Sequence, residues 1–455
     1  MQEQKVSFSD YLVIGVMLFA LFFGAGNLIF PAQLGQYAGE SLWPAVIGFL
    51  VTGVGLPLLG VIAIGFSGSS NLQELSSRVH PVYGVLFTSL LYLTIGPFFA
   101  IPRTATVPFE VSIAPLIGDM NPQIGLFIFS LFFFAITLWF SLSPSKLVDR
   151  IGKVLSPALI ALLLVLIVMS MINPIGGTGA PQGDYATGAF AKGFLEGYNT
   201  MDALASLVFA IIVINAIKGL GVKSEKGILN ATAKSAVVAA VFLGAIYLGI
   251  AFMGSITVEK YGYFETGGPV LSTVASHYLG GFGLTFLAIV MFLACLTTAI
   301  GLISSCAQYF HTLFPNVHYK VLATIFSLIS FIIANFGLAN IISFSIPVLM
   351  FLYPLTIVLM LLTFLSPLFR HSQLVYVSAI AVTFLISIVD GLVALCDSLG
   401  IEMFSWLAAI VSFYDKVLPF YDQGLGWLVP ALMVIVVTGV VSRFLLAHEK
   451  STVVQ

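Results

Sequence analysis

Long apolar runs, each about as long as a bilayer is thick, constrain the fold of this chain more than any other feature. A membrane-spanning helix needs about 20 mostly apolar residues, whereas the strands of a membrane barrel show short alternating segments. With 59% hydrophobic and only 8% charged residues, the chain does not fit a soluble protein. We therefore expect an all-α polytopic membrane protein. Hydropathy predicts twelve spans, near residues 10–35, 42–66, 82–112, 124–142, 152–172, 186–217, 232–256, 279–309, 320–337, 339–365, 374–396 and 425–447.

Basic residues predict the orientation of the spans, because cytoplasmic loops carry an excess of Lys and Arg. With the N-terminus inside, Arg103 lies within a span, and only Lys192, Lys260 and Lys416 of the 17 Lys and Arg residues lie outside. Both termini are thus expected in the cytoplasm. The net charge of −2 gives no sign of nucleic-acid binding. The chain has no H-E-x-x-H motif and no P-loop, so we expect neither an enzyme site nor ATP-driven transport.

The first apolar run contains a segment, residues 20–31 (ALFFGAGNLIFP), that predicts a broken helix. Gly24 and Gly26 make non-helical dihedrals easier, and Pro31 removes the helical partner of the Asn27 carbonyl. Unpaired backbone at membrane depth persists only where it faces a cavity or a ligand. A half-helix starting near Asn27 would direct free N–H groups at that cavity, which suits a carboxylate there and a cation on the carbonyl side. Close helix packing is the alternative interpretation of Gly-Ala-Gly.

A Gly/Pro-rich outer loop at residues 173–185 divides the first ten spans into two groups of five, residues 1–172 and 186–365. In a two-repeat transporter, the first span of each repeat carries the interruption. Span six fits, because a polar segment from Glu196 to Asp202 precedes an apolar run, and Asp202 is placed to cap a second half-helix. Spans one and six would run in opposite directions, so we expect an inverted repeat. The alternative is that span six begins at Asp202 and that the preceding residues form an outer loop.

The remaining residues, 366–455, are expected to form two peripheral C-terminal helices. Between them, residues 397–424 mix charged and aromatic side chains, which suggests a short helix in the outer membrane interface. Trp43 and Trp427 lie near outer span ends, where interface anchors are expected.

Polar side chains at membrane depth mark further candidate positions. Thr297 and Thr298 in span eight could supply two neutral oxygens to a small hard cation, although a membrane Thr usually bonds its own i−4 carbonyl. Arg103 and Glu110 in span three are two helical turns apart on one face. An ion pair with a structural or gating role is favoured for them over substrate contact, and the alternative is that each lines a water path.

Four segments carry a family resemblance: residues 23–31 (FGAGNLIFP), 96–105 (GPFFAIPRTA), 197–205 (GYNTMDALA) and 296–302 (LTTAIGL). These motifs, the order in which they occur and the number of predicted spans resemble those of the bacterial branched-chain amino acid:cation symporters of the BrnQ type. The resemblance covers essentially the whole chain. The resemblance implies uptake of leucine, isoleucine and valine with sodium, or with protons in some relatives, across the bacterial plasma membrane. It implies the leucine-transporter architecture, with broken spans one and six, and no cofactor or obligatory protein partner.

The resemblance also implies site residues by position. The amides of Ala25 and Gly26 would hold the substrate carboxylate, and Asn27 is beside them as a substrate contact or as a ligand of a second sodium. In span six the correspondence is looser and covers Tyr198, Asn199, Thr200 and Met201. The implied sodium ligands are the carbonyls of Ala20, Phe23 and Ala294 and the hydroxyls of Thr297 and Thr298.

The substrate side chain would enter an apolar pocket, for which Phe22, Phe98, Phe99 and Met201 are candidates. Two alternatives stay open. One is a proton symporter that uses Asp202 or Glu110 as the carrier. The other is a protein of a different class, a passive channel or a membrane receptor.

Overall fold

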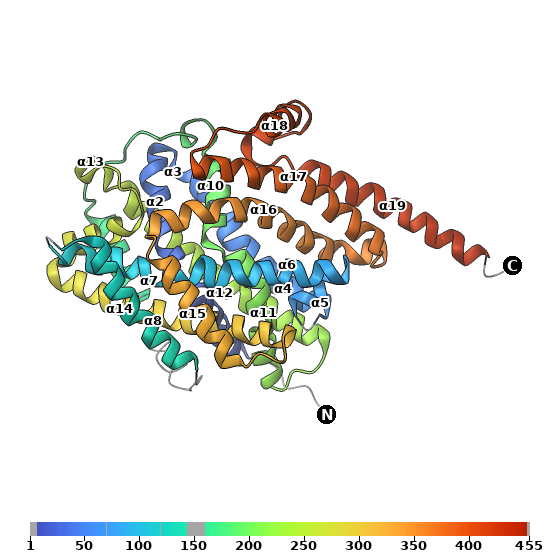
Figure 1. The fold of residues 1–455 in the computed structure, drawn as a ribbon, viewed down its shortest axis with the longest axis horizontal. Coiled ribbons are helices and arrows are strands. Elements are labelled where there is room, and N and C mark those ends of the chain that lie inside the picture. Colours follow the sequence, from blue (N-terminus) through green and yellow to red (C-terminus); the bar gives the residue numbers. More distant parts are fainter. Residues whose placement is uncertain (1–6, 70, 119, 143–159, 453–455) are drawn as a thin grey trace.

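The computed structural model describes residues 7–69, 71–118, 120–142 and 160–452. Every regular element in this part of the chain is a helix (Figure 1). Eight helical segments are long and apolar enough to cross a bilayer, and four shorter apolar helices accompany them: Phe8–Phe22, Ile160–Ile172, Tyr319–Ala334 and Leu428–Phe444. The all-α membrane fold is confirmed. The number of spans and the inverted repeat stay predictions, and part of the fifth predicted span lies outside the described residues.

The first span is broken where the sequence predicts it. Helix α1 (Phe8–Phe22) ends before Phe23, and α2 (Ala25–Ala38) begins after Gly24, whose backbone is extended at φ −122° and ψ −163°. The second half-helix thus starts two residues before Asn27. Helix α2 then packs closely on α12 (Glu225–Ser255), because a Cβ atom at Gly35 would overlap the Ala251 carbonyl.

The residues before Asp202 are helical and do not form a plain loop, and the chain is interrupted between them and the apolar helix that begins at Asp202. Helix α10 (Tyr185–Glu196) leads into a 3₁₀ turn, η6 (Gly197–Thr200), and then into α11 (Asp202–Gly219). Met201 lies between them in the left-handed region at φ 62°, a conformation that costs a non-glycine residue about 1–2 kcal/mol. Asp202 is the first residue of α11 and its side chain does not cap the helix, so the predicted capping role is wrong.

Span three has a break that the sequence analysis did not predict. Helix α6 (Pro81–Leu93) is followed by a wide turn, η3 (Thr94–Phe98), and then by α7 (Ala100–Pro108). Within the turn, Gly96 is non-helical, and a Cβ atom there would overlap the sulfur of Cys306. The freed carbonyl of Pro97 accepts a hydrogen bond from Ser330 Oγ at 3.3 Å. Glycine followed by proline was the available signal for this break.

The last helices pack side by side at one edge of the molecule. Helix α16 (Leu338–Leu365) contacts α17 (Gln373–Leu399), which in turn contacts α19 (Leu428–Thr452), and the far end of α19 extends beyond the other helices (Figure 1). A short helix, α18 (Ser405–Val417), precedes α19, and its location in a membrane interface stays a prediction.

The two tryptophans differ in their surroundings. Trp43 is 62% exposed, but Trp427 is 1% exposed and packs in the core. The prediction of an interface anchor is therefore wrong for Trp427. Position near a span end indicates depth in the membrane, but it does not show which side of the helix faces the lipid.

The remaining elements are η1 (Gly39–Ser41), α3 (Leu42–Leu50), η2 (Val51–Gly55), α4 (Leu56–Ser67), α5 (Leu72–Ser76), η4 (Phe109–Ile113), η5 (Ala114–Leu116), α8 (Pro122–Ser141), α13 (Val258–Tyr261), α14 (Gly268–Leu313, interrupted at Gly280), α15 (Tyr319–Ala334), η7 (Ser366–Phe369) and η8 (Tyr421–Gln423).

Candidate functional site

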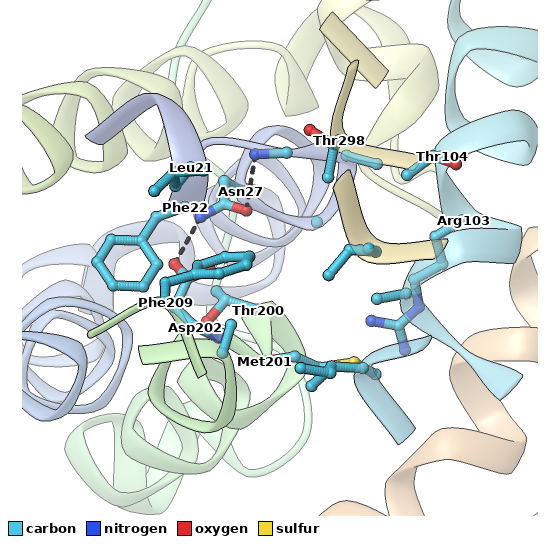
Figure 2. Close-up of a pocket in the computed structure, with 17 residues that line it drawn as sticks. Leu21, Phe22, Asn27, Arg103, Thr104, Thr200, Met201, Asp202, Phe209 and Thr298 are labelled. Atoms are coloured by element: carbon cyan, nitrogen blue, oxygen red, sulfur yellow. Dashed lines mark hydrogen bonds between the residues drawn. The ribbon is translucent and has the colours of Figure 1, made fainter. Parts of the chain in front are cut away.

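The breaks in spans one and six border the same small cavity, to which α7 and α14 also contribute (Figure 2). Its volume is about 50 Å³, enough for a few water molecules, so an amino acid requires the cavity to widen. The predicted site residues that line it are Ala25, Gly26, Asn27, Arg103, Thr200, Met201, Asp202 and Thr298. The predicted residues that do not line it are Ala20, Phe23, Glu110, Tyr198, Asn199, Ala294 and Thr297.

Unpaired backbone groups flank the break in the first span. The amide of Phe23, the residue that follows α1, still donates to Phe19 O at 2.8 Å. The next amide, that of Gly24, donates instead to Asn27 Oδ1 at 3.2 Å, so the Ala20 carbonyl lacks its helical partner. Residues in the first turn of a helix have no i−4 carbonyl for their N–H groups, and the positive end of the helix dipole lies there. The start of α2 at the cavity therefore favours an anionic group.

A buried carboxylate joins the two broken spans. Asp202 is 3% exposed, and its Oδ2 accepts hydrogen bonds from Asn27 Nδ2 at 2.5 Å and from Tyr247 OH at 2.7 Å. Asn27 Nδ2 also contacts Tyr247 OH. Within the described part of the chain, Asp202 has no cationic partner. Tyr247 lies on α12 and was not predicted, because a single tyrosine in an apolar span carries no local signal.

A buried cation lies elsewhere on the same cavity. Arg103 is 2% exposed, and it donates from Nη1 to Asn199 O at 2.8 Å and from Nη2 to Ser345 Oγ at 2.5 Å. Its guanidinium carbon is 5.1 Å from the centre of the Phe30 ring. Figure 2 shows Arg103 and Asp202 on different sides of the pocket.

The predicted ion pair between Arg103 and Glu110 is wrong. Glu110 Oε2 accepts a hydrogen bond from Thr266 Oγ1 at 2.7 Å, and Glu110 does not line the cavity. The prediction assumed an ideal helix, but α7 ends at Pro108 and continues as a wide π-type turn over residues 109–113. That turn changes the face on which Glu110 lies.

The residues predicted to hold sodium are only partly assembled. A Cβ atom on Gly24 would lie 3.6 Å from the Thr298 methyl carbon, so the first break and α14 are in contact. The hydroxyls of Thr297 and Thr298 donate to the Ala294 carbonyl at 2.8 and 3.2 Å, which leaves their own lone pairs free. Because these bonds already engage the Ala294 carbonyl, a cation there would have to displace at least one of them.

Apolar side chains form the rest of the cavity wall. Phe22 and Met201 line it as expected, whereas Phe98 and Phe99 do not. Phe209 also lines the cavity, with its ring centre 6.0 Å from that of Phe22, and was not predicted from the sequence. Leu21 and Gly24, from the predicted break, also line the cavity, as do five residues that were not predicted to do so: Ile95, Ala100, Thr104, Ala205 and Leu302.

Helices broken within apolar spans around a shared cavity are typical of membrane transporters. The chain belongs to the family of branched-chain amino acid transport proteins, whose model matches residues 7–445. It is 47% identical to the branched-chain amino acid permease BrnQ of Bacillus subtilis, over 94% of this chain and 96% of that protein. It is 41% identical to the branched-chain amino acid transport system 2 carrier protein of Pseudomonas aeruginosa, over 96% and 97% of the two chains.

Among solved structures, the chain is similar to Mhp1, a nucleobase-cation-symport-1 family transporter. The closed conformation with bromovinylhydantoin bound matches with a TM-score of 0.61 and 13% identity, over 96% of this chain and 93% of that one. The inward-facing conformation of Mhp1 gives a TM-score of 0.60. At this low identity the similarity establishes the fold alone, and it confirms the predicted leucine-transporter type of fold.

Proposed function

We propose that this protein imports leucine, isoleucine and valine together with Na⁺ across the bacterial plasma membrane by alternating access. Both termini would lie in the cytoplasm. The observation that carries the proposal is the break in the first span, where the start of α2 and Thr298 border one cavity. Relatives that are branched-chain amino acid permeases and carriers support the substrate class.

The substrate carboxylate would bind at the amides of Ala25 and Gly26, where the helix dipole favours negative charge. The side chain would face Phe22, Phe209 and Leu302. An apolar pocket discriminates by only about 1–3 kcal/mol per methylene, so all three branched-chain amino acids should be accepted.

Na⁺ would bind between the first break and α14, with the carbonyls of Ala20, Phe23 and Ala294 and the hydroxyls of Thr297 and Thr298 as ligands. The unpartnered Ala20 carbonyl and the free hydroxyl lone pairs support this set, because carbonyls at unwound segments coordinate Na⁺ in transporters of this type. An ion that orders the break raises the affinity for leucine, and leucine raises the affinity for the ion by the same factor.

A second candidate is proton coupling through Asp202. The observation that favours it is a buried carboxylate on the cavity without a cationic partner in the described part of the chain. Glu110 is a weaker carrier on this account, because it lies outside the cavity.

Uptake of radiolabelled leucine into proteoliposomes tests the proposal. At clamped pH, an inward Na⁺ gradient should drive accumulation above equilibrium, and an equal K⁺ gradient should not. Accumulation driven by a pH gradient and indifferent to Na⁺ would favour Asp202 instead. Downhill flux that neither gradient can drive above equilibrium would indicate a passive channel.

A further inference from the structure

We propose that Arg103 and Asp202 together bind the charged ends of the substrate, with Arg103 at the α-carboxylate and Asp202 at the α-ammonium group. The inference rests on the proposed function and deepens it. It explains how the cavity would select α-amino acids, because a ligand would need both a carboxylate and an ammonium group to bind.

Arg103 carries a buried positive charge with which no acidic side chain in the described part of the chain forms a salt bridge. Its partners are two neutral oxygens, the Asn199 carbonyl and the Ser345 hydroxyl. Its buried Nε has no hydrogen-bond partner, although a guanidinium has five N–H donors. Buried charges in proteins are normally paired, and arginine suits planar carboxylates. An arginine that lines a cavity in this state is suited to bind a carboxylate there.

Asp202 carries a buried negative charge that also lacks a partner of opposite charge among the described residues. Asn27 and Tyr247 are neutral donors, and both bond the same carboxylate oxygen, Oδ2. Among the described residues, Oδ1 has no donor, and no Lys, Arg or His forms a salt bridge with the group. A primary ammonium group has three donors and the opposite charge. It would satisfy the free oxygen and neutralise the carboxylate.

The two charges share one cavity but form no salt bridge with each other. A zwitterionic α-amino acid, whose ammonium and carboxylate groups are attached to the same carbon, can pair with both. A ligand with only one of the two charges leaves the other side chain buried and unpaired, which is strongly unfavourable. The cavity would therefore reject the 2-oxo acids and the amines that share a branched side chain with these amino acids.

Asn27 acts as a positioning residue in this arrangement. Its amide nitrogen donates to Asp202 Oδ2, and its amide oxygen accepts a hydrogen bond from the Gly24 N–H. One side chain therefore connects the break in the first span to the start of α11. The α2 amides and the Arg103 guanidinium then face the carboxylate from two elements.

Displacement of tritiated leucine from the purified full-length protein tests the inference. In saturating Na⁺, three competitors are compared: leucine, 4-methylpentanoate, which lacks the ammonium group, and 3-methylbutylamine, which lacks the carboxylate. Wild-type protein should prefer leucine over both analogues. Arg103→Gln should weaken leucine about 30-fold or more but leave 3-methylbutylamine unchanged. Asp202→Asn should weaken leucine by a similar factor of about 30 but leave 4-methylpentanoate unchanged.

The controls are Arg78→Gln and Asp390→Asn, which remove like charges at positions that do not line the cavity. Arg103→Lys keeps the charge and should retain part of the affinity if Arg103→Gln does not fold. Leucine affinity that is unchanged in Arg103→Gln, or equal losses for all three ligands in a folded variant, would overturn the inference alone. A wild-type protein that does not bind leucine would instead overturn the proposed function.

Discussion

Replacing Asn27 by alanine should disrupt the junction between the two broken spans. Asn27 is 2% exposed, and its removal leaves the Gly24 N–H and the Asp202 carboxylate each without one partner. A buried hydrogen bond to a charged group contributes about 1.5–3 kcal/mol, and a buried amide without a partner costs about 1–3 kcal/mol. Because such terms are not additive, we expect a loss of about 2–4 kcal/mol in unfolding free energy. We also expect loss of Na⁺-coupled leucine uptake.

Asn335→Ala is the matched control. Asn335 donates to Ser130 Oγ at 3.1 Å and to Phe331 O at 2.8 Å, so both of its partners are neutral, and it does not line the cavity. Its removal should cost only about 0.5–1.5 kcal/mol. Thermal unfolding of both purified variants, followed by uptake in proteoliposomes, measures the difference. If Asn27→Ala unfolds at the same temperature as Asn335→Ala and retains coupled uptake, the structural reasoning about this junction is refuted.

Three further perturbations test other parts of the account. Thr298→Ala should raise the Na⁺ concentration for half-maximal uptake about tenfold, whereas Thr285→Ala, on the same helix but away from the cavity, should not. Gly35→Val should abolish folded protein in size-exclusion chromatography, because a side chain there overlaps the Ala251 carbonyl; a normal elution profile would contradict this packing. Phe209→Ala should widen the pocket so that phenylalanine inhibits leucine uptake. If phenylalanine does not inhibit uptake by this variant, Phe209 does not limit the size of the substrate side chain.

Local signals allowed the breaks in spans one and six to be predicted from the sequence. Glycines and a proline inside an apolar run, or a polar segment before one, act on the backbone where they occur. The break at Gly96 has the same kind of signal, a glycine followed by Pro97, although no break was predicted there. The exact ends of helices were harder to predict from the sequence. The cap position predicted for Asp202 is occupied by Met201, which adopts a left-handed conformation.

Contributions from distant helices could not be predicted in the same way. Tyr247 reaches Asp202 across 45 residues of sequence, and Arg103 reaches Ser345 across 242. Such contacts depend on how the helices pack. The assumed pairing of Arg103 with Glu110 failed for a related reason, because spacing predicts a shared face only while the helix stays regular.

The most direct test of the central claim is the equilibrium affinity of the purified protein for leucine as a function of Na⁺ concentration, at constant ionic strength and pH. If one cavity binds both substrate and ion, the dissociation constant for leucine should fall as Na⁺ rises, and leucine should tighten Na⁺ binding by the same factor. A dissociation constant that is independent of Na⁺ would contradict the account.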